Sequence, residues 1–208
     1  MSDSLQLPDE TYEFIKGEAV DCVVRFGAQY PLDGFLLASR MGIEVVKYSE
    51  LPNAERMESI SCSESGYCKE VPGGAIIYLN DTTNPAHQKT TVLHEIGHIK
   101  LDHMPCAEFN RDARAERHDL EQVRESEANF FAKYINAPPP LIALLPTIDI
   151  LSVRNAFGLS VEAARIAVSY FSKWKEHFKG RYKDYEERLL EHAQEQFLCY
   201  LKQAGFLR

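Results

Sequence analysis

The stretch Thr91–Lys100 reads Thr-Val-Leu-His-Glu-Ile-Gly-His-Ile-Lys and contains the pattern His-Glu-x-x-His. His94 and His98 are four residues apart, so on an α-helix they share one face, with Cβ atoms roughly 5–6 Å apart. Two imidazoles at this spacing can hold one Zn²⁺ at bond lengths of about 2.0–2.1 Å. Glu95 leaves the helix at a different angle and can act beside the metal as a general base. A charged helix with two surface histidines has the same spacing, so the surrounding sequence must decide between the two interpretations.

The sequence around this stretch favours a buried helix. Asn84-Pro85 is typical of an N-cap followed by proline at the first helical position, and we expect the helix to run to about Asp102. Apolar residues at helical spacing form a stripe that would bury it, namely Val92, Ile96 and Ile99. Gly97 is a poor helix former. Its place between the histidines indicates close packing or room for a substrate.

A catalytic zinc site needs a third protein ligand and one open position. Glu125 is the strongest candidate, in a segment of helical pattern that also contains Asn129. These two residues share a helical face, so Asn129 can hydrogen-bond a ligand histidine from the outer shell. Glu127 is expected to point roughly 160° away around the helix. The weaker candidates downstream of the motif are Cys106, His118, Glu121 and Glu127. An ordinary solvent-exposed charge remains the alternative role for Glu125.

Taken together, His94-Glu95-x-x-His98 and Glu125-x-x-Ala128-Asn129-x-Phe131-Ala132 resemble the motifs of the ImmA/IrrE family of small bacterial zinc metallopeptidases. The resemblance spans roughly residues 30 to 170. It implies a zincin-like fold, an intracellular location and peptidase activity against repressor proteins. One Zn²⁺ per chain would be held by His94, His98 and Glu125, with Glu95 as the catalytic base.

The chain departs from the family pattern in two places. Residues 134–140, Tyr-Ile-Asn-Ala-Pro-Pro-Pro, replace a Leu-Leu-Met-Pro-like run, and the residues after Lys173 match no family feature. The departures leave the substrate and its regulation open. A zincin site also needs a donor that stabilises the oxyanion, and the candidates are Tyr134 and His118. His103 follows His98 by five residues, so we interpret it as a helix-end residue and not as a ligand.

Composition and charge argue against several other classes of protein. The chain has 208 residues and a net charge of −8, which argues against broad nucleic-acid binding. No apolar run reaches the ~20 residues of a membrane helix, and the N-terminus has no signal-peptide pattern, so we expect a cytoplasmic protein with no membrane partner. The five cysteines are scattered and do not indicate a disulfide framework.

The remaining pattern predicts an α+β fold, with a small mixed or antiparallel sheet packed on a mostly helical body. Strands are expected at residues 42–48, 67–71 and 75–80, while residues 51–65 are ambiguous and could hold a strand near Ile60. Helices are expected at residues 11–30, 33–41, 85–102, through 125–135, and at 148–158, 160–170 and 183–203. A sheet edge near the metal would let a substrate peptide add as a further strand, and we expect residues 60–71 to form that edge.

We expect a zincin-like metallopeptidase domain at residues 1–173 and a helical extension at 174–208 packed on it. The first would have its metal core at about 75–140 and accessory helices at 141–173. The aromatic extension is a candidate surface for self-association. Residues 148–170 resemble a helix-turn-helix around Phe157–Ser160. Beside a zinc endopeptidase that acts on a repressor-type protein, two alternatives therefore remain: a metal-containing transcription regulator, and a toxin–antitoxin or scaffold protein.

Overall fold

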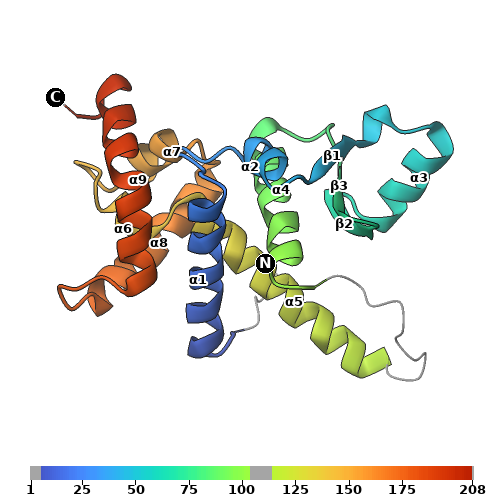
Figure 1. The fold of residues 1–208 in the computed structure, drawn as a ribbon, viewed down its shortest axis with the longest axis horizontal. Helices are drawn as coiled ribbons and strands as arrows, with labels where there is room; N and C mark the ends of the chain where they lie inside the picture. The colour runs from blue at the N-terminus through green and yellow to red at the C-terminus, as the bar shows by residue number, and fades with distance from the viewer. Residues whose placement is uncertain (1–5, 104–113, 208) are drawn as a thin grey trace.

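A computed structural model describes residues 6–103 and 114–207, and in the second range it describes side chains from residue 119 on. The helices are α1 (Asp9–Arg25), α2 (Gly34–Arg40), α3 (Asn53–Cys62), α4 (Pro85–Lys100), α5 (Arg114–Asn136), α6 (Pro139–Ile142), α7 (Ile150–Phe157), α8 (Val161–His177) and α9 (Asp184–Gln203). The strands are β1 (Glu44–Lys47), β2 (Gly66–Val71) and β3 (Gly74–Leu79), with a short 3₁₀ turn at Tyr48–Glu50. Figure 1 shows the strands gathered at one end of a mostly helical body.

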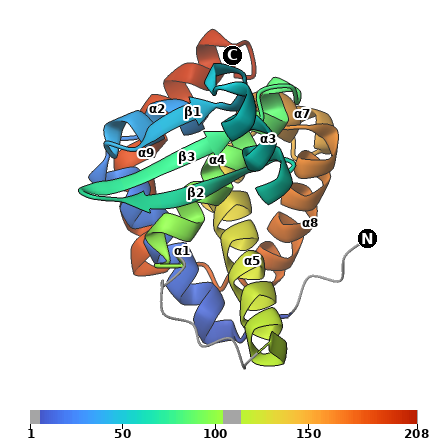
Figure 2. The same cartoon turned by 90° about the vertical axis from the view of Figure 1, so that its right-hand side faces the viewer.

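The sheet has the order β1-β3-β2. β1 runs parallel to β3, with Val45 opposite Ile77, and β2 forms an antiparallel hairpin with β3, with Gly66 opposite Leu79. In the described part of the chain, β2 is therefore an edge strand. The sheet lies across α4, as the turned view in Figure 2 shows, and both β2 and β3 contact that helix. This arrangement confirms the predicted α+β class and the small mixed sheet.

Helix α4 begins and ends close to where the sequence predicts. The Asn84 side chain accepts a hydrogen bond from the His87 backbone N–H at 3.0 Å, and Pro85 occupies the first turn. At the other end, Leu101 caps the helix and Asp102 adopts a left-handed backbone conformation with φ of 55°. The helix is anchored by Val92, Leu93 and Ile96, which are fully buried. Its position in the core follows from this apolar face.

Helices α4 and α5 pack closely at Gly97. A Cβ atom on this glycine would lie 3.1 Å from Cδ1 of Phe131 and 3.3 Å from both Cα and the carbonyl oxygen of Ala128. The glycine therefore serves close packing, the first of the two roles expected for it. Because the helices approach at this point, residues of α5 are brought beside the histidines of α4.

Helix α1 and residues 53–62 differ from the sequence prediction, and α8 runs to His177 instead of the expected residue 170. Helix α1 ends at Arg25 instead of near residue 30, because Gly27 turns the chain with φ of 62°. Residues 53–62 form helix α3, so a strand near Ile60 is wrong. The Arg56 side chain donates hydrogen bonds to the carbonyls of Tyr48 and Ser49, and these bonds fix the first turns of α3 against the 3₁₀ turn.

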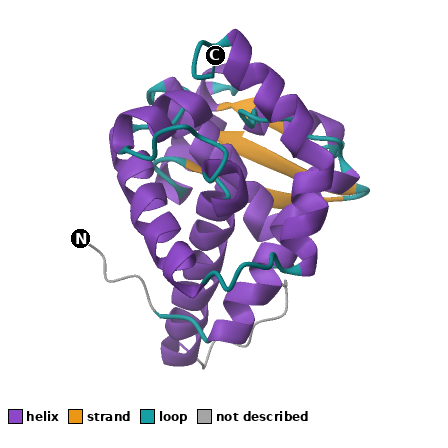
Figure 3. Ribbon diagram, turned by 90° about the vertical axis from the view of Figure 1, so that its left-hand side faces the viewer, coloured by secondary structure: helices purple, strands orange, loops and turns teal. Residues whose placement is uncertain are grey.

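The C-terminal helix α9 packs against α1 and α6. Figure 3 shows the helices in front of the sheet when the molecule is viewed from the side opposite to Figure 2. At the start of α9, Lys183 and Tyr185 both hydrogen-bond the Glu13 carboxylate of α1. The segment predicted to resemble a helix-turn-helix consists of α7 and α8, joined at Gly158, with Phe157 buried in the core. No helix in the described ranges is long and apolar enough to cross a membrane.

Candidate metal centre

Helix α4 presents His94 and His98 on one face, one turn apart. Their Nε2 atoms lie 3.0 Å from each other, and the rings are 4.6 Å apart between centroids at an interplanar angle of 78°. Both side chains are partly buried. Two ring nitrogens that approach this closely can direct their lone pairs at a common point, as two ligands of one cation do.

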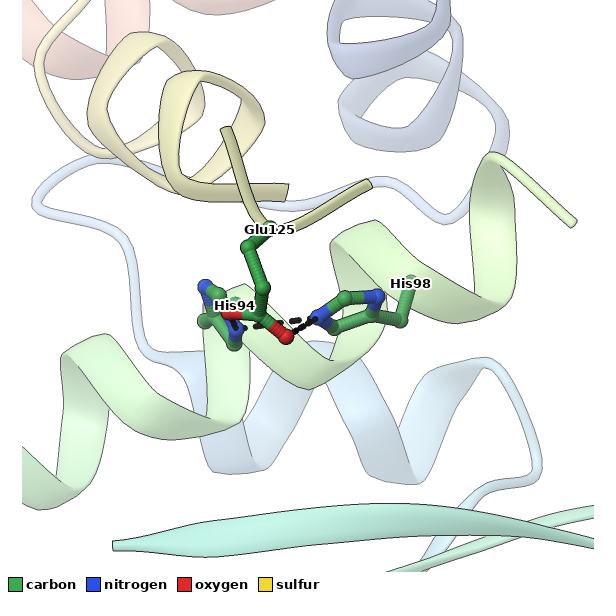
Figure 4. A group of neighbouring side chains, drawn as sticks. All are labelled: His94, His98 and Glu125. Carbon is green, nitrogen blue, oxygen red and sulfur yellow. Dashed lines mark hydrogen bonds and ion pairs between the residues drawn. The ribbon is translucent and has the colours of Figure 1, made fainter. Parts of the chain in front are cut away.

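Glu125 of α5 completes the group from the facing helix. Its Oε2 lies 3.4 Å from Nε2 of His94, and its Oε1 lies 3.3 Å from Nε2 of His98. Figure 4 shows the carboxylate directed between the two rings. The sequence prediction that these three residues converge therefore matches the geometry, with the ligand atoms all within 4.8 Å of one another.

These separations fit the donor set of a divalent metal. Four ligands at about 2.0–2.2 Å in tetrahedral geometry lie roughly 3.3–3.6 Å from each other, close to the three distances found here. Two imidazoles and one carboxylate are also ligands that zinc and similar cations accept. The neighbouring imidazoles of His94 and His98 hold the pKa of Glu125 well below its usual range, so the carboxylate is ionised at neutral pH. The residues present can thus hold a divalent metal ion.

Glu95 lies beside this group without belonging to it. Its side chain lines the same cleft and is only 5% exposed. Burial raises the pKa of Glu95, and the nearby His94, His98 and a hydrogen bond from the Cys68 thiol oppose that rise. A buried carboxyl whose pKa is raised is suited to accept and return a proton.

The cleft around these residues has a volume of about 540 Å³. One wall is the start of the edge strand β2, which contributes Gly66, Tyr67 and Cys68. Within residues 60–71, where the edge is expected from the sequence, residues 66–71 form the strand, and the residues before them belong to α3 and its end. The same cleft is lined by His94, His98 and Glu125.

Of the other predicted site residues, one lines the cleft and one does not. Asn129 lines the cleft, but among the described residues no hydrogen bond joins it to either ligand histidine, so its outer-shell role stays a prediction. Tyr134 is a correction: it is 2% exposed, packs on Phe130 and Tyr170 in the helical core and does not line the cleft. Nine residues at about 100° each place it half a turn from Glu125 on α5. The side chain of His118 lies outside the described residues.

Sequence reasoning missed a pair of residues behind the ligands. Nδ1 of His103 lies 3.2 Å from Nδ1 of His98, and Nε2 of His103 lies 2.9 Å from Oε2 of Glu127. Burial, together with the nearby His98 and Arg124, lowers the pKa of His103 to about 4, so its ring is neutral at neutral pH. The signal that could have found His103 is the end of α4, which reverses the chain before this residue.

Comparison with known proteins places the fold and the site in a family. The family described as the IrrE N-terminal-like domain, of the peptidase class, matches residues 38–169, well over half of the chain. A search of curated proteins gives no match. The matched residues include α4 and α5 and therefore every candidate ligand. The chain belongs to this family, whose members have a zincin-like fold and a metallopeptidase-type function.

Proposed function

From membership in this family and from the convergence of His94, His98 and Glu125, we propose that the protein is a zinc-dependent endopeptidase that cleaves a repressor-type regulatory protein. The observation that carries the proposal is the place of Glu95. A buried carboxyl with a raised pKa lies in the same cleft as the three candidate ligands without being one of them. A site that held a metal for structure alone would not need such a base.

Each residue would have a distinct role. His94, His98 and Glu125 would hold the zinc ion, which when bound polarises a carbonyl oxygen and acidifies water. The Glu95 carboxylate would accept a proton from the attacking water. It would then donate that proton to the amine nitrogen that leaves when the peptide bond breaks. Burial of Glu95 keeps bulk water from competing for this proton.

The substrate would bind in extended form along β2. Edge strands have unpaired backbone N–H and C=O groups, and an extended peptide can pair with them as a further strand. Gly66 and Tyr67 bring this edge to the cleft, so the pairing would align one peptide bond with the candidate ligands. A cleft open along a strand favours a flexible protein segment as the substrate over a small molecule.

Repressor proteins are the substrate class that the family resemblance implies, and such a substrate would be met in the cytoplasm. Net charge of −8 is consistent with a protein partner and unfavourable for broad nucleic-acid binding. The repressor itself is identified by testing which candidate protein is cleaved. A candidate encoded beside this protein's gene is the natural first choice.

The test is cleavage of purified candidate repressors by the purified protein, followed by mass spectrometry of the products. We expect cleavage by the wild type, none after treatment with a chelator, and recovery on addition of Zn²⁺. Glu95→Gln keeps the side-chain shape but removes the base, so the rate should fall by about 10²–10⁴-fold while zinc content is retained. Elemental analysis of protein never exposed to chelator should find one zinc per chain.

Glu121→Gln is the matched control, because Glu121 is exposed on α5 and the same neutralisation there should leave the rate unchanged. Cleavage that survives both chelation and Glu95→Gln would overturn the peptidase assignment. If the cellular role survived Glu95→Gln but was lost on deletion of residues 157–175, the regulator or scaffold alternative would replace it.

A further inference from the structure

The end of α4 reverses the chain in a defined way. The backbone N–H of Asp102 donates to the carbonyl of Ile99 at 3.4 Å, and the N–H of His103 donates to the carbonyl of His98 at 2.9 Å. With Asp102 left-handed at φ of 55°, these bonds form a Schellman motif. In this motif the residue two places beyond the cap returns over the residue five earlier. His103 is thereby brought onto His98.

The usual contact at this point of a Schellman motif is hydrophobic. Here it joins two imidazoles through their Nδ1 atoms, 3.2 Å apart, with ring centroids 5.3 Å apart and an interplanar angle of 70°. The His103 side chain is only 6% exposed, and its other ring nitrogen lies 2.9 Å from Oε2 of Glu127 on α5. Asp102 adopts the left-handed conformation that this reversal needs, and aspartate is one of the few residues besides glycine that adopt it.

One assignment of the ring protons pairs a donor with an acceptor at each of these contacts. Nε2 of His98 faces Glu125 at 3.3 Å and must keep its lone pair free if it is to bind a metal, so the ring proton is on Nδ1. That N–H donates to Nδ1 of His103. The proton of His103 is then on Nε2, and it donates to the Glu127 carboxylate. Each of the three groups has a partner of the complementary kind.

We propose that His103 and Glu127 are positioning residues for the ligand His98, fixing its tautomer and ring orientation so that Nε2 faces the metal. The proposal rests on the proposed metal site and adds to it two residues outside the ligand set. Hydrogen bonds of this type orient metal-binding histidines and increase their basicity. Glu125 and Glu127 both belong to α5. This helix would therefore supply one ligand of the metal and, through His103, also fix the Nδ1 side of the His98 ring.

The test measures metal affinity, not activity. The dissociation constant for Zn²⁺ is determined by competition with a chromophoric chelator, for the wild type, Glu127→Gln and His103→Phe. Removing an outer-shell partner typically weakens metal binding by about 10–100-fold, and we expect this for both variants. Glu121→Gln removes the same charge from the same helix, so its affinity should stay within about twofold of wild type if the contact and not the charge matters.

Two further readouts distinguish positioning from packing. Because the residues act in series, the double variant should bind metal no more weakly than His103→Phe alone. In NMR spectra of the zinc-loaded wild type, the Nδ1–H proton of His98 should exchange slowly with water, and in His103→Phe this signal should be lost.

The proposal is overturned if Glu127→Gln, which keeps the side-chain shape, and His103→Phe both bind zinc within about twofold of wild type. A lower melting temperature with unchanged affinity would also overturn it, because His103 would then only pack the helix end. A wild type that binds no zinc would refute the proposed function and, with it, this inference. A wild type that binds zinc as tightly as the variants refutes the inference alone.

Discussion

Gly97→Ala tests whether the close approach of α4 and α5 holds the metal site together. Alanine in a helix interior is favoured over glycine by about 1 kcal/mol, so the substitution would stabilise an isolated helix. In this protein the added Cβ meets Phe131 at 3.1 Å and two backbone atoms of Ala128 at 3.3 Å. Optimal carbon–carbon contacts lie at about 3.5–4.0 Å. The Ala128 atoms belong to the α5 backbone, so α5 itself must move away by a few tenths of an ångström.

Overpacking of this kind costs about 1–3 kcal/mol, which meets or exceeds the helix-propensity gain. We expect a net loss of about 0–2 kcal/mol in the free energy of unfolding. The effect on metal binding should be clearer, because Glu125 moves with α5 while His94 and His98 stay on α4. Its oxygens lie 3.3 and 3.4 Å from the ring nitrogens, so a small outward shift separates the ligands.

The matched control is Gly17→Ala in the interior of α1, where a Cβ would meet nothing within 4 Å. This variant should gain about 0.5–1 kcal/mol, which is a rise of about 1–4 °C in melting temperature for a chain of this length. Both variants are compared by thermal unfolding with and without zinc and by zinc competition. The reasoning fails if Gly97→Ala gains as much stability as Gly17→Ala and binds zinc as tightly as wild type.

Three other perturbations follow from the same structure. Chelation should lower the melting temperature, because a ligand at 100 times its dissociation constant stabilises by about 2.7 kcal/mol, and an unchanged melting temperature would speak against a metal. Burial raises the pKa of Glu13, but hydrogen bonds from Lys16 and Lys183 outweigh it and lower the pKa to about 2 from an ordinary 4.5. The stability that this carboxylate contributes is therefore present above pH 4.5 and lost as the pH falls toward 2. In urea unfolding, Glu13→Gln should lose less stability than wild type between pH 4.5 and pH 2. A loss equal to that of wild type would contradict this prediction. Gly66→Ala would place a Cβ 2.8 Å from the carbonyl oxygen of Tyr78, so β2 should be destabilised by about 1–3 kcal/mol, measured as a lower melting temperature; a higher one would contradict the packing.

Local patterns were sufficient where the structure is local. The limits of α4 follow from Asn84-Pro85 and from the apolar stripe, and β3 follows from its run of apolar residues. Glu125 was found because ligand chemistry and helical spacing agree on one face. Helix α3 could not be assigned in this way, since its apolar residues Met57 and Ile60 are exposed and no core face is visible in the pattern.

Contacts between distant segments were the part that spacing could not supply. Cys68 reaches Glu95 because β2 is the edge strand beside α4, and strand order cannot be obtained from one sequence. Tyr134 is the opposite case, because its distance of nine residues from Glu125 already places it on the far face of the same helix. The helical period alone therefore argues against Tyr134 as a candidate oxyanion donor.

For His103 and Glu127, helical spacing correctly separated both residues from the ligand set but could not show that they contact each other. Residues five apart do not share a helical face, and Glu127 does point away from Glu125 on α5. Both statements assume that the helix continues. Helix α4 ends at Lys100, and beyond its cap the chain turns back at Asp102, so residue 103 returns to residue 98. From there His103 reaches the side of α5 that Glu125 does not occupy.

The end of α4 is therefore part of the site. If the helix ran one residue further, the same reversal would return the chain onto Ile99 instead of His98, and the contacts of His103 with His98 and Glu127 would be lost. The reversal can be predicted from a His-Glu-x-x-His pattern in which the fourth residue after the second histidine tolerates the left-handed conformation and the fifth is again histidine. Applied to this chain, such a rule selects Asp102 and His103, and a glutamate two residues beyond the third ligand supplies the partner.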